Sequence, residues 1–291
     1  MSPIVCAVSA RNLLGEGPVW DERDGRLWWV DIKGGRLSWL EPASGDSGSR
    51  AVGGQVSALA PRAGGPGLLA ARKDGLGILD PASGVFEHRL DPEPERPGNR
   101  ANDGNVDLAG RFWFGTMDDR ESEVTGAIYR LDADWSHHRV LDGIGISNTL
   151  VCNPACSAIY IADSMARTIE TLAIDPATGA PGARRPFADT CGETCGPDGS
   201  AVDEEGFLWN AQWGGARIVR YAPNGSIDRI VPMPVDQPTS CAFGGKDLGT
   251  LYITTARASL SVEALARQPL AGSLLAFNPG VRGLSLPPFA G

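Results

Sequence analysis

A short segment of aromatic and aliphatic residues recurs six times along the chain at nearly constant spacing. The copies are Leu27–Asp31, Gly67–Ala71, Arg111–Gly115, Ala158–Ala162, Phe207–Ala211 and Thr250–Thr254, and their centres lie 40, 44, 47, 49 and 43 residues apart. Repeats of this length each form one supersecondary unit that must stack on its neighbours to bury its apolar face. This repeat constrains the fold more strongly than any single motif.

Each repeat predicts more than one strand. A strand precedes the recurring segment, as at Ser200–Asp203, and another follows it, as at Gly126–Asp132, with turn residues between them. Glycine and proline number 38 and 22 of 291 residues, which is a turn-rich composition. Four short antiparallel strands per repeat predict an all-β, six-bladed β-propeller with four-stranded antiparallel blades. We expect Ile4–Val8 to pair with the last blade and close the ring.

The alternatives to a propeller are a β-sandwich or two separate β-domains. No linker-like segment divides the chain, so one domain covering residues 1–291 is favoured. The oligomeric state is expected to be a monomer or a small homo-oligomer.

Charge and hydropathy exclude several kinds of partner. Lys and Arg total 26 against 35 Asp and Glu, a net charge of −9, which argues against nucleic-acid and anionic-membrane binding. No apolar run reaches the 18 to 20 residues that span a bilayer, and Met1–Ala10 lacks the basic start of a secretory signal. We therefore expect a cytoplasmic protein with mostly reduced cysteines, although Cys191 and Cys195 would suit a local disulfide in an oxidising compartment.

The repeat also selects equivalent positions near the axis. In a propeller the innermost strand of each blade lines the central channel, and four of these strands are expected to end in an Asp or Asn. Counting five residues back from these ends, and matching the other two repeats by their distance from the recurring segment, selects one residue per blade. The six positions are Glu16, Ser57, Asn102, Asn148, Asp198 and Thr239.

All six side chains offer oxygen. Two acids and two amides directed into one narrow channel would repel one another or stay unsatisfied without a partner, and a hard divalent cation provides one. The absence of His and Cys from this set disfavours a structural zinc site. The alternative is that Asn102 and Asp198 only stabilise turns, since Asn102-Asp103-Gly104 is an ordinary turn sequence.

Several segments, in order and at fitting spacing, resemble the gluconolactonase/regucalcin (senescence marker protein) family. They are Leu14–Trp20, Asn99–Gly104, Gly115–Met117, Ile146–Asn148, Pro197–Gly199 and the ending Gly280–Gly291. The resemblance implies a six-bladed propeller with one catalytic divalent metal that hydrolyses a sugar lactone to the aldonic acid. By motif, Glu16, Asn148 and Asp198 are the implied metal ligands, and Arg100 and Asn102 the implied substrate-binding residues.

One segment departs from the family pattern. After Gly-Thr-Met the family often places a glutamate near the substrate, whereas this chain has Asp118-Asp119-Arg120-Glu121. Asp119 and Glu121 are both candidates for that substrate-binding position.

These residues suggest a mechanism. A divalent ion polarises the lactone carbonyl, and calcium, magnesium, manganese, zinc and iron(II) are all open. Asp198 is the candidate catalytic base, with metal ligation alone as its alternative role. Arg100 would orient the substrate or stabilise the developing oxyanion, and Asn102, with a donor and an acceptor, would bind a pair of hydroxyls.

Two other classes of function remain open. One is a metal-dependent hydrolase of other lactones or of phosphotriesters, and the other is a non-catalytic calcium-binding propeller. A Ser–His–Asp triad is disfavoured, because His88, His137 and His138 fall in outer turns rather than on the inner strands.

Overall fold

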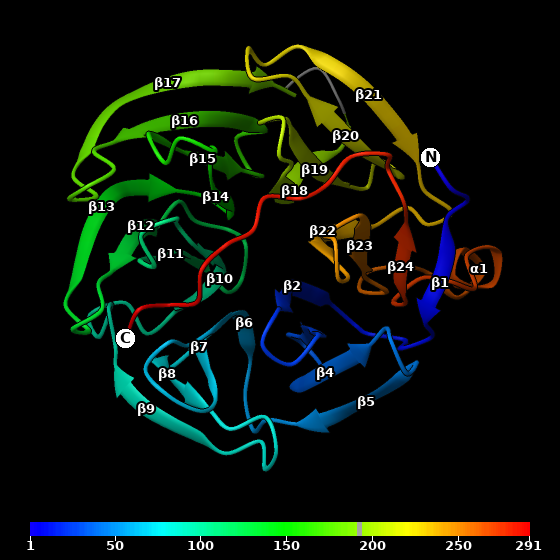
Figure 1. Ribbon diagram of the computed structural model, residues 1–291, viewed down its shortest axis with the longest axis horizontal. Coiled ribbons are helices and arrows are strands. Elements are labelled where there is room, and N and C mark those ends of the chain that lie inside the picture. Colours follow the sequence, from blue (N-terminus) through cyan, green and yellow to red (C-terminus); the bar gives the residue numbers. More distant parts are fainter. Residues whose placement is uncertain (191–193) are drawn as a thin grey trace.

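Six four-stranded antiparallel sheets surround a central axis, and the computed structural model describes residues 1–190 and 194–291 (Figure 1). Blade 1 comprises β2 (Gly15–Asp21), β3 (Arg26–Asp31), β4 (Arg36–Glu41) and β5 (Asp46–Ala51); blade 2 comprises β6 (Val56–Pro61), β7 (Leu68–Arg72), β8 (Gly75–Leu79) and β9 (Phe86–Leu90). Blade 3 comprises β10 (Asn99–Val106), β11 (Phe112–Asp118), β12 (Gly126–Leu131) and β13 (His137–Ile144). The predicted six-bladed propeller is confirmed.

The remaining blades follow the same order from the axis outward. Blade 4 comprises β14 (Ser147–Cys152), β15 (Ala158–Asp163), β16 (Thr168–Ile174) and β17 (Pro181–Asp189); blade 5 comprises β18 (Gly196–Val202), β19 (Leu208–Trp213), β20 (Arg217–Tyr221) and β21 (Ile227–Pro232). Blade 6 comprises β22 (Pro238–Gly244), β23 (Thr250–Thr255), β24 (Leu274–Phe277) and β1 (Val5–Val8).

Blade 6 joins the two ends of the chain. The N-terminal strand β1 pairs antiparallel with β24, Val5 opposite Ala276, so it is the outermost strand of the last blade. The predicted closure of the ring is therefore confirmed. Helix α1 (Val262–Arg267) lies beside this blade, and no helix in the described chain is long and apolar enough to cross a membrane.

The recurring aromatic segment is the second strand of each blade, and its largest side chains form the core. Trp29, Trp113 and Trp209 are fully buried. Buried aspartates at the ends of two inner strands hold these rings: Asp107 accepts from Trp113 Nε1 and Asp203 from Trp209 Nε1, both at 2.9 Å. The aromatic residues therefore recur because each blade needs large side chains to fill its core.

Every inner strand contains an irregularity in its pairing with the second strand. The register shifts between Glu16 and Val19 in β2, between Ala101 and Gly104 in β10, and between Pro197 and Ser200 in β18. The same shift occurs in β6, β14 and β22. A β-bulge re-aims the side chains around it. All six bulges fall at the phase that the repeat selected, near the upper end of the channel, where the inner strands begin.

The C-terminal segment crosses the lower end of the channel, where the inner strands finish (Figure 1). This strap, residues 283–290, pairs Gly283 with Asp203 of blade 5 and Phe289 with Arg62 of blade 2. Ala290 N also donates to Gly110 O of blade 3. The Phe289 side chain is fully buried in the core of blades 2 and 3, so the strap is anchored at both its ends.

The five cysteines that the structure describes, at positions 6, 152, 156, 195 and 241, all carry free thiols, as expected. Cys191, the other partner of the suggested local disulfide, lies outside the described residues.

We expect Asp203→Ala to lower the free energy of unfolding by about 3 kcal/mol, because it leaves the buried Trp209 Nε1 without its acceptor and removes the most buried of the three carboxylates that hold Arg220. Asp175→Ala is the matched control: Asp175 stabilises an exposed turn, and its loss should cost about 1 kcal/mol or less. Urea unfolding followed by circular dichroism measures both. Equal losses in the two variants would contradict this view of the blade core.

Candidate functional site

The six positions selected by the repeat lie on the six inner strands and are all buried. Their side chains are 0–9% exposed, Asn102 the most and Thr239 the least. Asn102 and Asp198 lie within β10 and β18. The alternative that they only stabilise turns is therefore wrong: the bulges within the strands, rather than turns, set their direction.

Glu16 and Asp198 form a pair of buried carboxylates on which the charge of Arg100 acts only at longer range. No Lys, Arg or His nitrogen of the described chain lies within ion-pair distance of either, and each accepts a hydrogen bond from the following backbone N–H. Burial, followed by the charge of Asp103, raises the pKa of Glu16 to about 8. Burial and the charge of Glu16 raise the pKa of Asp198 well above its usual value.

Hydrogen bonds fix the amide of Asn148 beside this pair. Ser164 Oγ donates to Pro197 O at 2.6 Å, so it accepts from Asn148 Nδ2 at 2.8 Å. The Asn148 carbonyl oxygen therefore faces Asn102, whose Nδ2 donates to it at 3.0 Å and leaves one lone pair free. Two carboxylates and an oriented amide oxygen are a donor set that suits a hard divalent cation.

Two buried aspartates fix the backbone that leads into the inner strands carrying Glu16 and Asn148. Asp31 accepts from the backbone of Leu13 and Leu14, just before Glu16. Asp163 accepts in the same way from the two residues that precede β14, the strand that carries Asn148. Both aspartates end the second strand of their blade, so each blade fixes the entry of its own inner strand.

Asp103 is a third carboxylate at this end of the channel, partly buried, that the sequence reasoning did not select. It accepts from Thr149 N and Gly104 N at 2.8 Å, and burial raises its pKa. Its charge acts on both Glu16 and Asp198. Among the described residues, no three His, Cys, Asp or Glu side chains are grouped so that they could hold a metal ion. The adjacency of Asp103 to Asn102 within the bulge is the signal that would have identified it.

Arg100 brings one of the two acidic candidates into the site. Its guanidinium is buried, donating from Nε to Asp119 Oδ1 at 3.0 Å and from Nη1 to Asn102 Oδ1 at 2.6 Å. Glu121 is exposed, with a left-handed backbone at φ 58°, and acts on Arg100 through its charge alone. Of the two acidic candidates, Asp119 is the one in direct contact with Arg100.

Only some of the hydrogen-bonding groups of Asn102 and Arg100 remain free for a ligand. Both N–H groups of Asn102 are engaged, by Ser147 O and Asn148 Oδ1, so Asn102 offers only a lone pair. This differs from the expectation that it presents a donor and an acceptor. Arg100 uses three of its five donors, on Nε and Nη1, which leaves Nη2 available.

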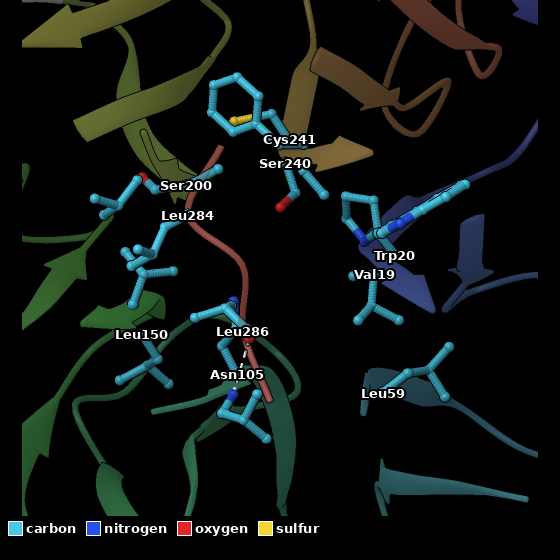
Figure 2. Close-up of a pocket in the computed structure, with 18 of the residues that line it drawn as sticks. Val19, Trp20, Leu59, Asn105, Leu150, Ser200, Ser240, Cys241, Leu284 and Leu286 are labelled. Atoms are coloured by element: carbon cyan, nitrogen blue, oxygen red, sulfur yellow. Dashed lines mark hydrogen bonds between the residues drawn. The ribbon is translucent and has the colours of Figure 1, made fainter. Parts of the chain in front are cut away.

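The other end of the channel has a different character (Figure 2). The cavity between the ring and the strap is lined mainly by apolar side chains, among them Val19, Leu59, Leu150, Leu284 and Leu286. Asp103 and Gly17 mark its upper limit. A hydroxylated substrate therefore suits the upper end, where Arg100 and Asn102 lie, better than this cavity.

The three histidines lie away from the axis. His88 is in β9, and His137 and His138 are in β13, which are the outermost strands of blades 2 and 3. They were expected in turns, and this detail is wrong, because the outer hairpins extend further than their polar sequences suggest. Their distance from the inner strands agrees with the argument against a catalytic triad.

Comparisons with known proteins show which family the chain resembles. Residues 14–257 match the family model described as the SMP-30/Gluconolactonase/LRE-like region. A 6-deoxy-6-sulfogluconolactonase from Pseudomonas putida is 36% identical over 290 residues, covering 98% of each chain. An L-arabinolactonase from Azospirillum brasilense is 37% identical over 284 residues, covering 97% of this chain and 93% of that one.

A solved structure shares the whole architecture. The calcium-binding protein regucalcin from Agrobacterium tumefaciens superposes with a TM-score of 0.94 at 32% identity, covering 99% of this chain and 97% of that one.

We expect the metal-free protein to lose stability as the pH rises. The folded-state pKa of Glu16, about 8, lies above its ordinary 4.5, and that of Asp198 is also raised, so the folded chain holds these protons more tightly than the unfolded chain does. Their contribution is complete below pH 4.5 and is lost as the pH rises towards 8. Melting temperatures between pH 5.5 and 8.5, measured in chelator, test this.

Glu16→Gln should weaken this pH dependence, whereas Glu41→Gln, at the partly exposed end of β4, should leave it unchanged. A metal-free protein whose melting temperature rises steadily towards pH 8.5 would contradict the prediction.

Proposed function

Because this chain belongs to the SMP-30/gluconolactonase/LRE-like family, we propose that it hydrolyses a sugar lactone to the aldonic acid with the help of one divalent cation. The observation that carries the proposal is the meeting of two kinds of group at one end of the channel. A buried carboxylate pair without an ion-pair contact, Glu16 and Asp198, lies close enough to Arg100 to feel its charge, and Arg100 in turn contacts Asn102.

Glu16, Asn148 and Asp198 would hold the cation. Calcium, magnesium, manganese, zinc and iron(II) all accept oxygen ligands, and the similarity to a calcium-binding regucalcin makes calcium one candidate. When bound, the cation supplies Lewis acidity towards the lactone carbonyl and increases the acidity of water.

The chain's own residues then position and activate the reactants. Asp198, as a carboxylate, accepts a proton from the attacking water, whose oxygen bonds to the carbonyl carbon. The ester C–O bond of the ring breaks, and the ring oxygen leaves as a hydroxyl after receiving the proton that Asp198 took from the water, which returns Asp198 to its carboxylate form. Arg100 Nη2, which has no hydrogen-bond partner in the described chain, would donate to the carbonyl or to a ring hydroxyl, and the free lone pair of Asn102 would accept from a hydroxyl.

The substrate class is the aldonolactones. The two bacterial relatives named above are lactonases of a sulfonated six-carbon sugar and of a five-carbon sugar, so carbon number and ring size are left to assay. The polar side chains at the upper end of the channel favour aldonolactones over apolar lactones and phosphotriesters. A calcium-binding protein without turnover is the remaining alternative.

The proposal is tested by lactone hydrolysis in a pH-indicator assay. Metal-stripped protein is given each of the five cations singly, on glucono-, galactono-, xylono- and arabinonolactone, with spontaneous hydrolysis subtracted. We expect one or more cations to restore activity, and Asp198→Ala to lower it by at least about a hundredfold. Asp46→Ala, on the exposed outer strand β5, is the matched control. Tight metal binding without turnover on any lactone would contradict the proposal.

We expect Arg100→Lys to lower kcat/KM by about tenfold to a hundredfold, because lysine keeps the charge but loses the Nη donors. Arg36→Lys, on the exposed edge of β4, is the control and should leave the kinetics unchanged. Melting temperatures establish that both variants are folded. If Arg100→Lys retains the full kcat/KM, Arg100 does not bind substrate as proposed.

A further inference from the structure

Lysine is rare in this chain, and its placement is uneven. There are three lysines among the 26 basic residues, namely Lys33, Lys73 and Lys246. Two of them, 40 residues apart in the sequence, meet at a single carboxylate, that of Asp119. The third lies in the turn after β22, at the lower end of the propeller.

Asp119 is surrounded by three cations. Lys73 Nζ lies 2.6 Å from Oδ2, Arg100 Nε lies 3.0 Å from Oδ1, and Lys33 Nζ lies 3.6 Å from Oδ1. Burial alone would raise the pKa of Asp119, but the hydrogen bond from Lys73 and the nearby positive charges lower it. Arg100 is also acted on by the charges of Glu121 and Glu16, whereas Asp119 is the one carboxylate of the described chain in ion-pair contact with Lys33 and Lys73, so the two lysines share a single counter-charge.

The two ammonium groups also have donors to spare. Each lysine has three N–H donors and directs one of them towards Asp119. The lysine side chains are 34% and 42% exposed, against 2% for Arg100, so their remaining donors face solvent. The Lys33–Lys73 pair is therefore a partly exposed cationic group held in place by a half-buried carboxylate.

This pair is connected directly to the proposed active site. Lys73 contacts Asp119, Asp119 contacts Arg100, Arg100 contacts Asn102, and Asn102 contacts the proposed ligand Asn148. A small hollow between blades 2 and 3 is lined by both Lys73 and Arg100, with Arg72 and Arg96 also on its wall. Asp91 and Glu93 line the same hollow, and Glu93 is engaged by Asn99, Tyr129 and Arg96.

We propose that Lys33 and Lys73 form a subsite for an anionic substituent, so that the enzyme prefers aldonolactones carrying a sulfonate or phosphate on the carbon farthest from the carbonyl. The inference rests on the proposed lactonase function. The lactone carbonyl would lie at the carboxylate pair, Arg100 would contact the ring, and the tetrahedral anion would accept from the two ammonium groups. No covalent step is added to the hydrolysis.

The test compares three substrates under the restored-metal conditions: D-glucono-1,5-lactone, the same lactone with a sulfonate in place of the 6-hydroxyl, and the 6-phosphate. The measured quantity is the ratio of kcat/KM for each anionic lactone to that for the neutral one. We expect a ratio above one that falls about tenfold in Lys33→Met/Lys73→Met. The sulfonate and phosphate arms show whether one or two negative charges are preferred.

Three controls separate an anion subsite from a structural role. Lys246→Met should leave the ratio unchanged, and Lys73→Arg should preserve most of it. Raising the salt concentration should reduce the preference, because the lysines are partly exposed. If the lysines only hold Asp119 and Arg100 in place, the double variant will slow neutral and anionic lactones equally, and that result would overturn the inference.

Binding of the reaction products distinguishes failure of the inference from failure of the lactonase proposal. Calorimetry compares gluconate with 6-deoxy-6-sulfogluconate and does not depend on turnover. Binding of the sulfonated acid that needs Lys33 and Lys73, without hydrolysis of any lactone, would retain the subsite and reject the lactonase. Hydrolysis of the neutral lactone with no preference for either anionic lactone would retain the lactonase proposal and reject the anion subsite.

Discussion

Two carboxylates, those of Glu16 and Asp198, are buried at the axis of the propeller with no basic group of the described chain in ion-pair contact, and the charge of Arg100 reaches them only at longer range. Isolated buried charges are costly, so the fold must either protonate these groups or supply a counter-charge from outside. The bulge in every inner strand places the two carboxylates there, and the hydrogen-bonded amides of Asn102 and Asn148 complete the ring. The rigidity of six packed blades keeps the two charges from moving apart.

The channel is divided into two ends by this ring. The upper end holds the polar groups and the cationic pair of Lys33 and Lys73, whereas the lower end is an apolar cavity covered by the strap. The strap and the recurring tryptophans stabilise the ring of blades. The loops at the upper end do not belong to this core, so under the proposed function they would determine which substrate enters. Substrate selection would then depend on few residues outside the core.

Much of this was predictable from the sequence, because the repeat carries two kinds of information. Its period predicted six blades and the closure by the N-terminal strand, and its phase selected buried inner-strand positions. The direction of Asn102 and Asp198 was less predictable, since a β-bulge and a turn share residues such as Asn, Asp and Gly. The strap was recognised only as a family motif, because its pairing with Arg62 and Asp203 is set by tertiary structure.

The contacts of Asp119 could not be predicted from the sequence. Asp119 and Glu121 are equally plausible by motif, and only the fold brings Lys33 and Lys73, 86 and 46 residues away in the sequence, to Asp119. Asp103 was missed for a related reason, as its neighbour Asn102 had the selected phase and the bulge turns both residues towards the axis. Contacts between blades are not encoded in any local pattern.

Anomalous diffraction from a crystal grown with manganese(II) would show whether the buried carboxylates hold a divalent cation. We expect one strong peak at the upper end of the channel, within bonding distance of oxygen atoms of Glu16, Asn148 and Asp198. Absence of a peak there at a pH where both carboxylates are ionised, or a peak bound only elsewhere, would contradict the proposed cation site.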